Sequence, residues 1–119
     1  MHWQIKHVGV ESSPALTGFV QRKVVEPLSR MADRIQRVLV RVKSGDGRAE
    51  AGGCGATVQV ALRGGPIVHV DAWEGCHYSA VDRAAERARR RVTRHLDRRA
   101  TRHRRSSRQR RDRPSDTRR

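Results

Sequence analysis

The run HYSAVDRAAERARRRVTRHLDRRA, residues 77–100, combines an apolar stripe and a row of arginines in one segment. At about 100° per residue, the apolar side chains of this run fall within about 80° of one another on a helical wheel. So narrow an arc predicts an amphipathic helix that packs its apolar face onto the rest of the domain. The stripe consists of Val81, Ala85, Ala88, Val92 and Leu96.

The arginines of this predicted helix fall on the side opposite the apolar stripe. Like charges spaced three or four residues apart destabilise a helix by a few tenths of a kcal/mol per neighbouring pair, and Glu86 and Asp97 are too few to neutralise them. Their spacing of about 5–6 Å along the helix is comparable to the phosphate spacing of a nucleic-acid strand. The pattern favours polyanion binding through phosphates over a merely solvated face. The row consists of Arg83, Arg87, Arg90, Arg94 and Arg98.

The net charge of the chain is concentrated after this point. The 119 residues carry a formal charge of +15, yet residues 1–82 hold 10 Lys/Arg and 8 acidic residues, whereas residues 83–119 hold 17 Arg and 4 acidic residues. Arg99 falls back onto the apolar side of the wheel, and from about Arg102 no apolar periodicity remains. We therefore expect one domain over residues 1–100 and a disordered arginine-rich tail over residues 101–119.

Upstream, alternating and helical patterns follow one another. Residues 2–8 alternate as a strand. Ser13 and Pro14 form a good helix start, followed by apolar residues at helical spacing as far as Val24. Pro27 is expected to kink or end that helix near Val25.

Three further strands are predicted in the middle of the chain, over residues 34–43, 54–63 and 66–73, with Gly64 and Gly65 as the turn of a hairpin. Residues 44–53 form the loop between the first two of them. The element order is thus β-α-β-β-β-α. It predicts an α+β fold, with one four-stranded sheet and both helices packed on one face.

The composition argues against several classes of protein. No stretch approaches the roughly 20 apolar residues of a membrane span, and the N-terminus lacks the apolar block of a signal peptide. Two cysteines are too few for a secreted disulfide scaffold. We expect a cytoplasmic protein without a membrane partner.

Little in the sequence points to catalysis. His7, Ser12 and Ser13 lie close together, but Ser13 has a capping role and no acidic partner is implied; residues 44–55 lack the Lys-Ser/Thr ending of a phosphate-binding loop. A metal site is conceivable, but paired C-x-x-C spacing is absent. We expect no enzyme activity, no small-molecule substrate, no cofactor and no metal. The metal ligands considered were Cys54, Cys76, His69 and His77.

Five short stretches occur in order along nearly all of residues 1–100, the most specific being YSAVD before a basic helix. The stretches are VESSPALTGFVQRKV (10–24), ADRI (32–35), GG (64–65), HVDA (69–72) and YSAVDRAAERARRRVTRH (78–95). Together they resemble the short ribosome hibernation-promoting factors and ribosome-associated translation inhibitors, the sigma-54 modulation protein-like family. The resemblance implies the β-α-β-β-β-α fold, which is similar to double-stranded-RNA-binding domains.

The resemblance also implies a function. Such proteins bind the small ribosomal subunit, on rRNA in the channel for mRNA and tRNA, and hold ribosomes inactive during stress or stationary phase. We expect the same of this chain, as a monomer off the ribosome. The RNA-contacting positions of the family carry over to Lys23, Arg87, Arg90 and Arg94, and the helical pattern adds Arg83, Arg91 and Arg98.

The chain departs from the family in several places. Thr17 replaces a basic residue, Cys76 replaces the aspartate before the last helix, and the first helix carries an extra residue around Pro27. The helix start at Cys76 is therefore expected to be weakened or capped in another way. Residues 101–119 are too short for the second, dimerising domain of the long family members, so dimerisation of ribosomes in their manner is not expected.

Two other functions stay open from the sequence. One is a generic double-stranded RNA or DNA binder that is not specific to the ribosome. The other is a regulator that docks on an acidic protein, whose binding would survive nuclease treatment.

Overall fold

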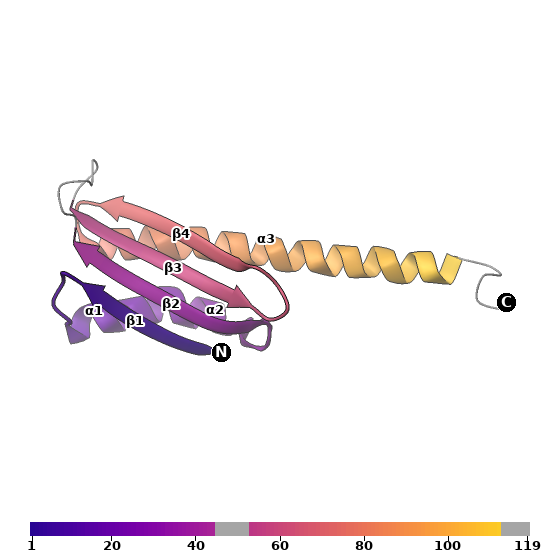
Figure 1. The fold of residues 1–119 in the computed structure, drawn as a ribbon, viewed down its shortest axis with the longest axis horizontal. Helices are drawn as coiled ribbons and strands as arrows, with labels where there is room; N and C mark the ends of the chain where they lie inside the picture. Colours follow the sequence, from indigo (N-terminus) through magenta and orange to yellow (C-terminus); the bar gives the residue numbers. More distant parts are fainter. Residues whose placement is uncertain (45–52, 113–119) are drawn as a thin grey trace.

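The computed structural model describes residues 1–44 and 53–112, with side chains described as far as residue 100. Its elements follow the predicted order, with the first helix divided into three consecutive helical segments (Figure 1). The predicted loop at 44–53 lies largely outside the described residues. The elements are β1 (His2–Val8), α1 (Pro14–Val20), the π-helical η1 (Gln21–Val25), α2 (Glu26–Ser29), the 3-10 turn η2 (Ala32–Arg34), β2 (Ile35–Ser44), β3 (Cys54–Leu62), β4 (Ile67–Glu74) and α3 (His77–Asp112).

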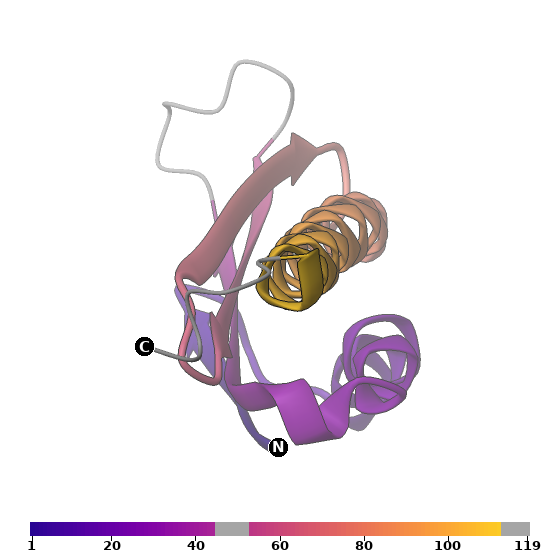
Figure 2. The same cartoon turned by 90° about the vertical axis from the view of Figure 1, so that its right-hand side faces the viewer.

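The four strands form one mixed sheet in the order β1-β2-β3-β4. β1 runs parallel to β2, which requires a crossover, and the helical segment α1–η1–α2 supplies it. The remaining neighbours are antiparallel, and β3 and β4 are joined by a tight turn in which Gly64 adopts a positive φ of 63°. Figure 2 shows the segment α1–η1–α2 and the helix α3 on the same face of the sheet. The predicted α+β fold is therefore confirmed.

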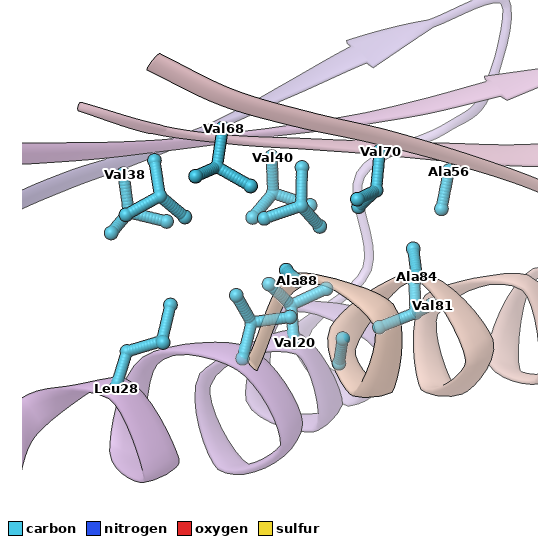
Figure 3. Packing of buried hydrophobic residues seen from close by; sticks show 14 of the residues in the cluster. Val20, Leu28, Val38, Val40, Ala56, Val68, Val70, Val81, Ala84 and Ala88 are labelled. Atoms are coloured by element: carbon cyan, nitrogen blue, oxygen red, sulfur yellow. The ribbon is translucent and has the colours of Figure 1, made fainter. Parts of the chain in front are cut away.

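The core lies between the sheet and these helices. Alternation along β2 buries Val38, Val40 and Val42 completely, as expected for one face of a strand. Figure 3 shows Val20 and Leu28 of the first helical segment, and Val81 of α3, pointing toward the valines of the sheet. The predicted apolar stripe of α3 is buried throughout, and Ala80 and Ala84 are buried beside it.

The first helix starts as predicted but continues past Pro27. The Ser13 hydroxyl accepts a hydrogen bond from the Leu16 N–H at 3.1 Å, and Pro14 occupies the first turn. The backbone then widens into a π-helical turn, in which the Glu26 N–H donates to the carbonyl of Gln21. The prediction that Pro27 ends or kinks the helix near Val25 is therefore wrong as to its end. Pro27 has no N–H to donate, and it follows directly after the π-helical turn, where the backbone hydrogen bonds already change their spacing.

The helix α3 is longer than predicted. Its backbone is helical to Asp112, so the expectation of disorder from about residue 102 is wrong as far as residue 112, and residues 113–119 lie outside the described part. Arginine is a good helix former, and a helix that tertiary packing has already nucleated extends by single residues at little cost. In the described part of the chain, no helix is both long and apolar enough to cross a membrane.

The start of α3 is capped by a cysteine. The Ser79 N–H donates to Cys76 Sγ at 3.4 Å, and the Ser79 hydroxyl lies 3.3 Å from the same sulfur. These two contacts with Ser79 lower the pKa of the exposed Cys76 thiol below its ordinary value. The sulfur thus takes over the capping role that the resemblance assigned to an aspartate.

Candidate nucleic-acid interface

The arginines of α3 lie along β4, the last strand of the sheet. The Arg87 guanidinium donates from Nη1 to the carbonyl oxygen of Asp71 at 2.7 Å, and Arg91 Nη1 donates to the carbonyl oxygen of His69, also at 2.7 Å. Both carbonyls belong to an edge strand, whose outer polar groups have no neighbouring strand to bind. The predicted row therefore does not lie simply opposite the core, because Arg87 lies on the flank of α3 that faces β4.

This flank forms a groove between α3 and β4, which we call the arginine groove. It is concave and continues toward the start of β4, where His95 and Arg98 join its wall. Five of the seven predicted site residues thus come together in one place. The arginine groove consists of His69, Val70, Asp71, Arg87, Arg90, Arg91, Arg94, His95 and Arg98, together with Ile67 and Val68.

The arginines keep donors free for a ligand. A guanidinium has five N–H donors, so Arg87 and Arg91 retain most of theirs after one bond to the backbone. Arg94 and Arg98 form no ion pair with any of the side chains described. The planar donor fork of arginine matches phosphate oxygens.

Two of the predicted arginines, Arg83 and Arg90, lie beside acidic side chains. Only the partner of Arg90 belongs to the same helix. Arg90 Nη2 lies 2.8 Å from Glu86 Oε1, one helical turn away, and Arg83 Nε lies 3.4 Å from Glu74 Oε2 of β4. All four side chains are substantially exposed, and exposed pairs of this kind contribute about 0–1 kcal/mol. A phosphate can therefore replace the carboxylate of Glu86 at little cost.

Asp71 lines the groove without neutralising it. Its carboxylate accepts a hydrogen bond from the Thr57 hydroxyl at 2.7 Å and lies 3.5 Å from His69 Nε2. Partial burial opposes ionisation of this carboxyl, but the bond from Thr57 and the nearby His69 and Lys43 outweigh it and lower its pKa. The carboxylate is thus engaged on its own strand and on β3, while Arg87 contacts only its main chain.

Lys23 lies apart from the groove. Its ammonium is 3.6 Å from Asp82 of α3 and 5.8 Å from the ring centroid of Phe19. Asp82 precedes Arg94 by about 18 Å along the helix axis, at 1.5 Å per residue. Lys23, from η1, and Arg83 therefore both lie at the first turns of α3. A ligand that contacts them as well as the arginine groove must extend along the helix.

The residues considered as metal ligands do not converge. Within residues 1–44 and 53–100, no three His, Cys, Asp or Glu side chains lie close enough together to hold a metal ion. Cys54 and Cys76 are both free thiols. Cys54 lies 3.7 Å from the Gly75 carbonyl, and Cys76 caps α3.

Comparisons with known proteins agree with this fold. A family model described as "Sigma 54 modulation protein / S30EA ribosomal protein" matches residues 3–100. A ribosomal subunit interface protein from Coxiella burnetii is similar in structure, with 21% identity, a TM-score of 0.66, and 82% of this chain and 99% of that chain covered. The N-terminal domain of Thermus thermophilus Protein Y has 24% identity and a TM-score of 0.60, over 79% of this chain and 98% of that chain. Among curated proteins, no significant sequence match was found.

Proposed function

The chain belongs to the sigma 54 modulation protein / S30EA ribosomal protein family, and from this membership we propose that it binds the small ribosomal subunit and inhibits translation. In this proposal the arginine groove lies on rRNA in the channel used by mRNA and tRNA. The protein holds ribosomes inactive during stress or stationary phase. It acts by occupying this channel, and catalyses no reaction.

The observation that carries the proposal is the arginine groove itself. Arginines that include Arg87, Arg91 and Arg94 line one concave surface against an edge strand, and most of their donors point to no acidic partner. Helical spacing places successive guanidinium groups about 5–6 Å apart. This geometry suits successive phosphates of a folded RNA, which proteins recognise mostly by shape and backbone.

We also propose residues 1–100 as the unit that binds the ribosome, in the cytoplasm and as a monomer. The family model ends at residue 100. Among the side chains of α3 that are described, as far as residue 100, the last buried apolar one is Leu96. Residues 101–119 hold nine arginines and two aspartates. In this proposal they add affinity for any nucleic acid.

Sedimentation of the purified chain with ribosomal particles tests this function. We expect the chain to travel with the small subunit and with vacant ribosomes in a sucrose gradient at physiological salt, and mRNA or tRNA to compete with it. A chain ending at Ala100 should still do so. For free RNA, log affinity should fall less steeply with log salt in the truncated chain than in the full chain. The slope should be shallower by about 0.7–0.9 for each phosphate contact that residues 101–119 had supplied.

Other outcomes identify the competing functions. Binding to free duplex RNA or DNA as tightly as to subunits would indicate a generic nucleic-acid binder. Binding that survives nuclease treatment of the particles would indicate an acidic protein as the partner. Loss of subunit binding on truncation at Ala100 would contradict the assignment of residues 1–100 as the binding unit.

A further inference from the structure

The face of the sheet opposite the helices carries a second group of basic side chains. Figure 2 shows this face with no helix across it. Strand pairing sets Lys6 of β1 beside Arg41 of β2. Along β2, Lys43 lies two residues and Arg37 four residues from Arg41. Alternation directs all three to the same side, at about 6.6 Å for every two residues.

A tryptophan lies flat on the same face. In the register of the sheet, Lys43, Gly55 and Trp73 form one row across β2, β3 and β4. The indole ring occupies the space above Gly55, since a Cβ added to that glycine would lie 2.7 Å from the ring. The Lys43 ammonium lies 5.3 Å from the ring centroid. The ring is partly exposed, so it offers a flat aromatic surface with a cation beside it.

We call these five residues, Lys6, Arg37, Arg41, Lys43 and Trp73, the basic sheet face. The only carboxylate that β1–β4 direct to this side within the described residues is that of Asp71, and Thr57 and His69 already engage it. Glu74 points to the helix side, where it meets Arg83. The net charge of the face is therefore positive and complementary to a polyanion.

Toward the start of β2 and β4, at the other end of the sheet from Trp73, the same face contains a polar groove. Two side-chain amides, from Gln4 and Gln59, lie in it between the cations of β1 and β2 and the exposed Ile67. Amides can donate to and accept from the edges of unpaired bases. The groove is lined by Gln4, Lys6, Arg37, Leu39, Gln59, Ala61 and Ile67.

We propose that the basic sheet face is a second nucleic-acid surface, which binds a single-stranded RNA segment with a base stacked on Trp73. The Lys43 ammonium then leaves the ring and, with Arg41 and Lys6, contacts the phosphates. A single strand is favoured over a duplex because only unpaired bases can stack on a protein ring. It is favoured over an acidic protein segment because such a segment would use the cations but not the ring.

This inference goes beyond the proposed function, since it concerns the opposite side of the molecule from α3. β4 lies between the arginine groove and the five residues of the basic sheet face, and only its edge residue Ile67 lines a groove on both sides. Two RNA segments can therefore be bound at once. A protein that binds between two RNA segments can hold them together. Neither surface requires the other for its own contacts.

Quenching of Trp73 fluorescence by a short oligouridylate tests the proposal on the full chain. We expect the oligonucleotide to quench the wild-type chain, and the quenching to be lost in a Trp73→Phe variant, whose smaller ring still covers Gly55. Only the part of the signal that depends on Trp73 reports this face, because Trp3 also emits. Titration of the Trp73-dependent quenching gives the affinity of the basic sheet face in every variant that keeps Trp73, because anisotropy would also report binding by the arginine groove and by residues 101–119.

Charge variants separate the two surfaces. The triple variant Arg37→Gln, Arg41→Gln, Lys43→Gln should bind the oligonucleotide at least about tenfold more weakly, whereas Arg30→Gln, an exposed change on α2's end, should not. Reversal of the groove arginines should leave Trp73 quenching in place. Since the ligand is a free oligonucleotide, the result does not depend on whether the chain binds ribosomes.

Three results would overturn the proposal. The first is an absence of Trp73-dependent quenching, and the second is unchanged affinity in the triple glutamine variant. The third is displacement of the oligonucleotide by polyglutamate as effectively as by unlabelled oligonucleotide, which would make this face a site for acidic protein segments.

Discussion

Replacing Arg87, Arg90 and Arg94 by Glu is expected to abolish binding to the small ribosomal subunit while the domain stays folded. Each arginine lines the arginine groove and is exposed, so a reversed charge there meets phosphate directly. A hydrogen bond to a charged group contributes about 1.5–3 kcal/mol. The loss of three such contacts predicts a decrease in affinity of about a thousandfold or more, before repulsion is counted. Sedimentation with purified subunits, with circular dichroism as the check on folding, measures both parts.

Single substitutions on the same helix give a matched control. Arg94 and Arg89 are both exposed on α3, but only Arg94 lines the groove. Arg94→Glu should weaken binding strongly and reduce the salt slope, whereas Arg89→Glu should have a small effect. Equal losses for the two would mean that net charge alone determines binding. Unchanged binding in the triple variant would rule out this flank of α3 as the interface.

Of the three substituted arginines, Arg87 also donates a hydrogen bond to the backbone of β4. Its bond to the Asp71 carbonyl holds α3 against β4, so Arg87→Glu removes that bond as well as a charge. Arg94 has no such contact among the described side chains. If Arg94→Glu alone weakens binding, as the triple variant does, the cause is therefore a lost RNA contact and not a displaced helix.

The sequence predicted those features that depend on local periodicity. Alternation in β2 and helical spacing in α3 determine which side of the strand or helix each residue faces. The residues predicted for the inner side are buried. Ser13 was identified as a cap because its hydroxyl acts on its own helix. Arg99 turns back toward the sheet as the wheel predicted, and donates to the Arg63 carbonyl at 3.0 Å.

Features that depend on neighbouring elements could not be predicted in the same way. A helical wheel gives the direction of Arg87 and Arg91 around α3, but not the edge strand that lies there. It also does not give the distance between Lys23 and Arg94, which belong to different helices. The extension of α3 beyond residue 100 was missed because apolar periodicity reports burial, and an arginine-rich segment can be helical without burying a face.

The first helix differs from the prediction in one respect, because it does not end near Val25. A proline inside a helical pattern usually kinks or ends the helix, and the apolar positions predicted for this helix stop at Val24. The π-helical turn at Gln21–Val25 carries the chain past this point, and Leu28 returns to the sheet with only 2% of its surface exposed. The extra residue noted around Pro27 is accommodated by that wider turn, in the manner of a π-bulge.

Leu28→Ala is accordingly expected to lower the free energy of unfolding by about 2–5 kcal/mol, as for other buried leucines. That is a large part of the roughly 5–15 kcal/mol that stabilises a typical domain. Urea unfolding followed by circular dichroism measures the change, with Arg30→Ala, an exposed position two residues further along the chain, as the matched control. If the helix ended near Val25 and the chain left the core there, the two substitutions would have similar, small effects. A large effect confined to Leu28 would place the segment after Pro27 in the core, where it covers β2 on the face that the helices share.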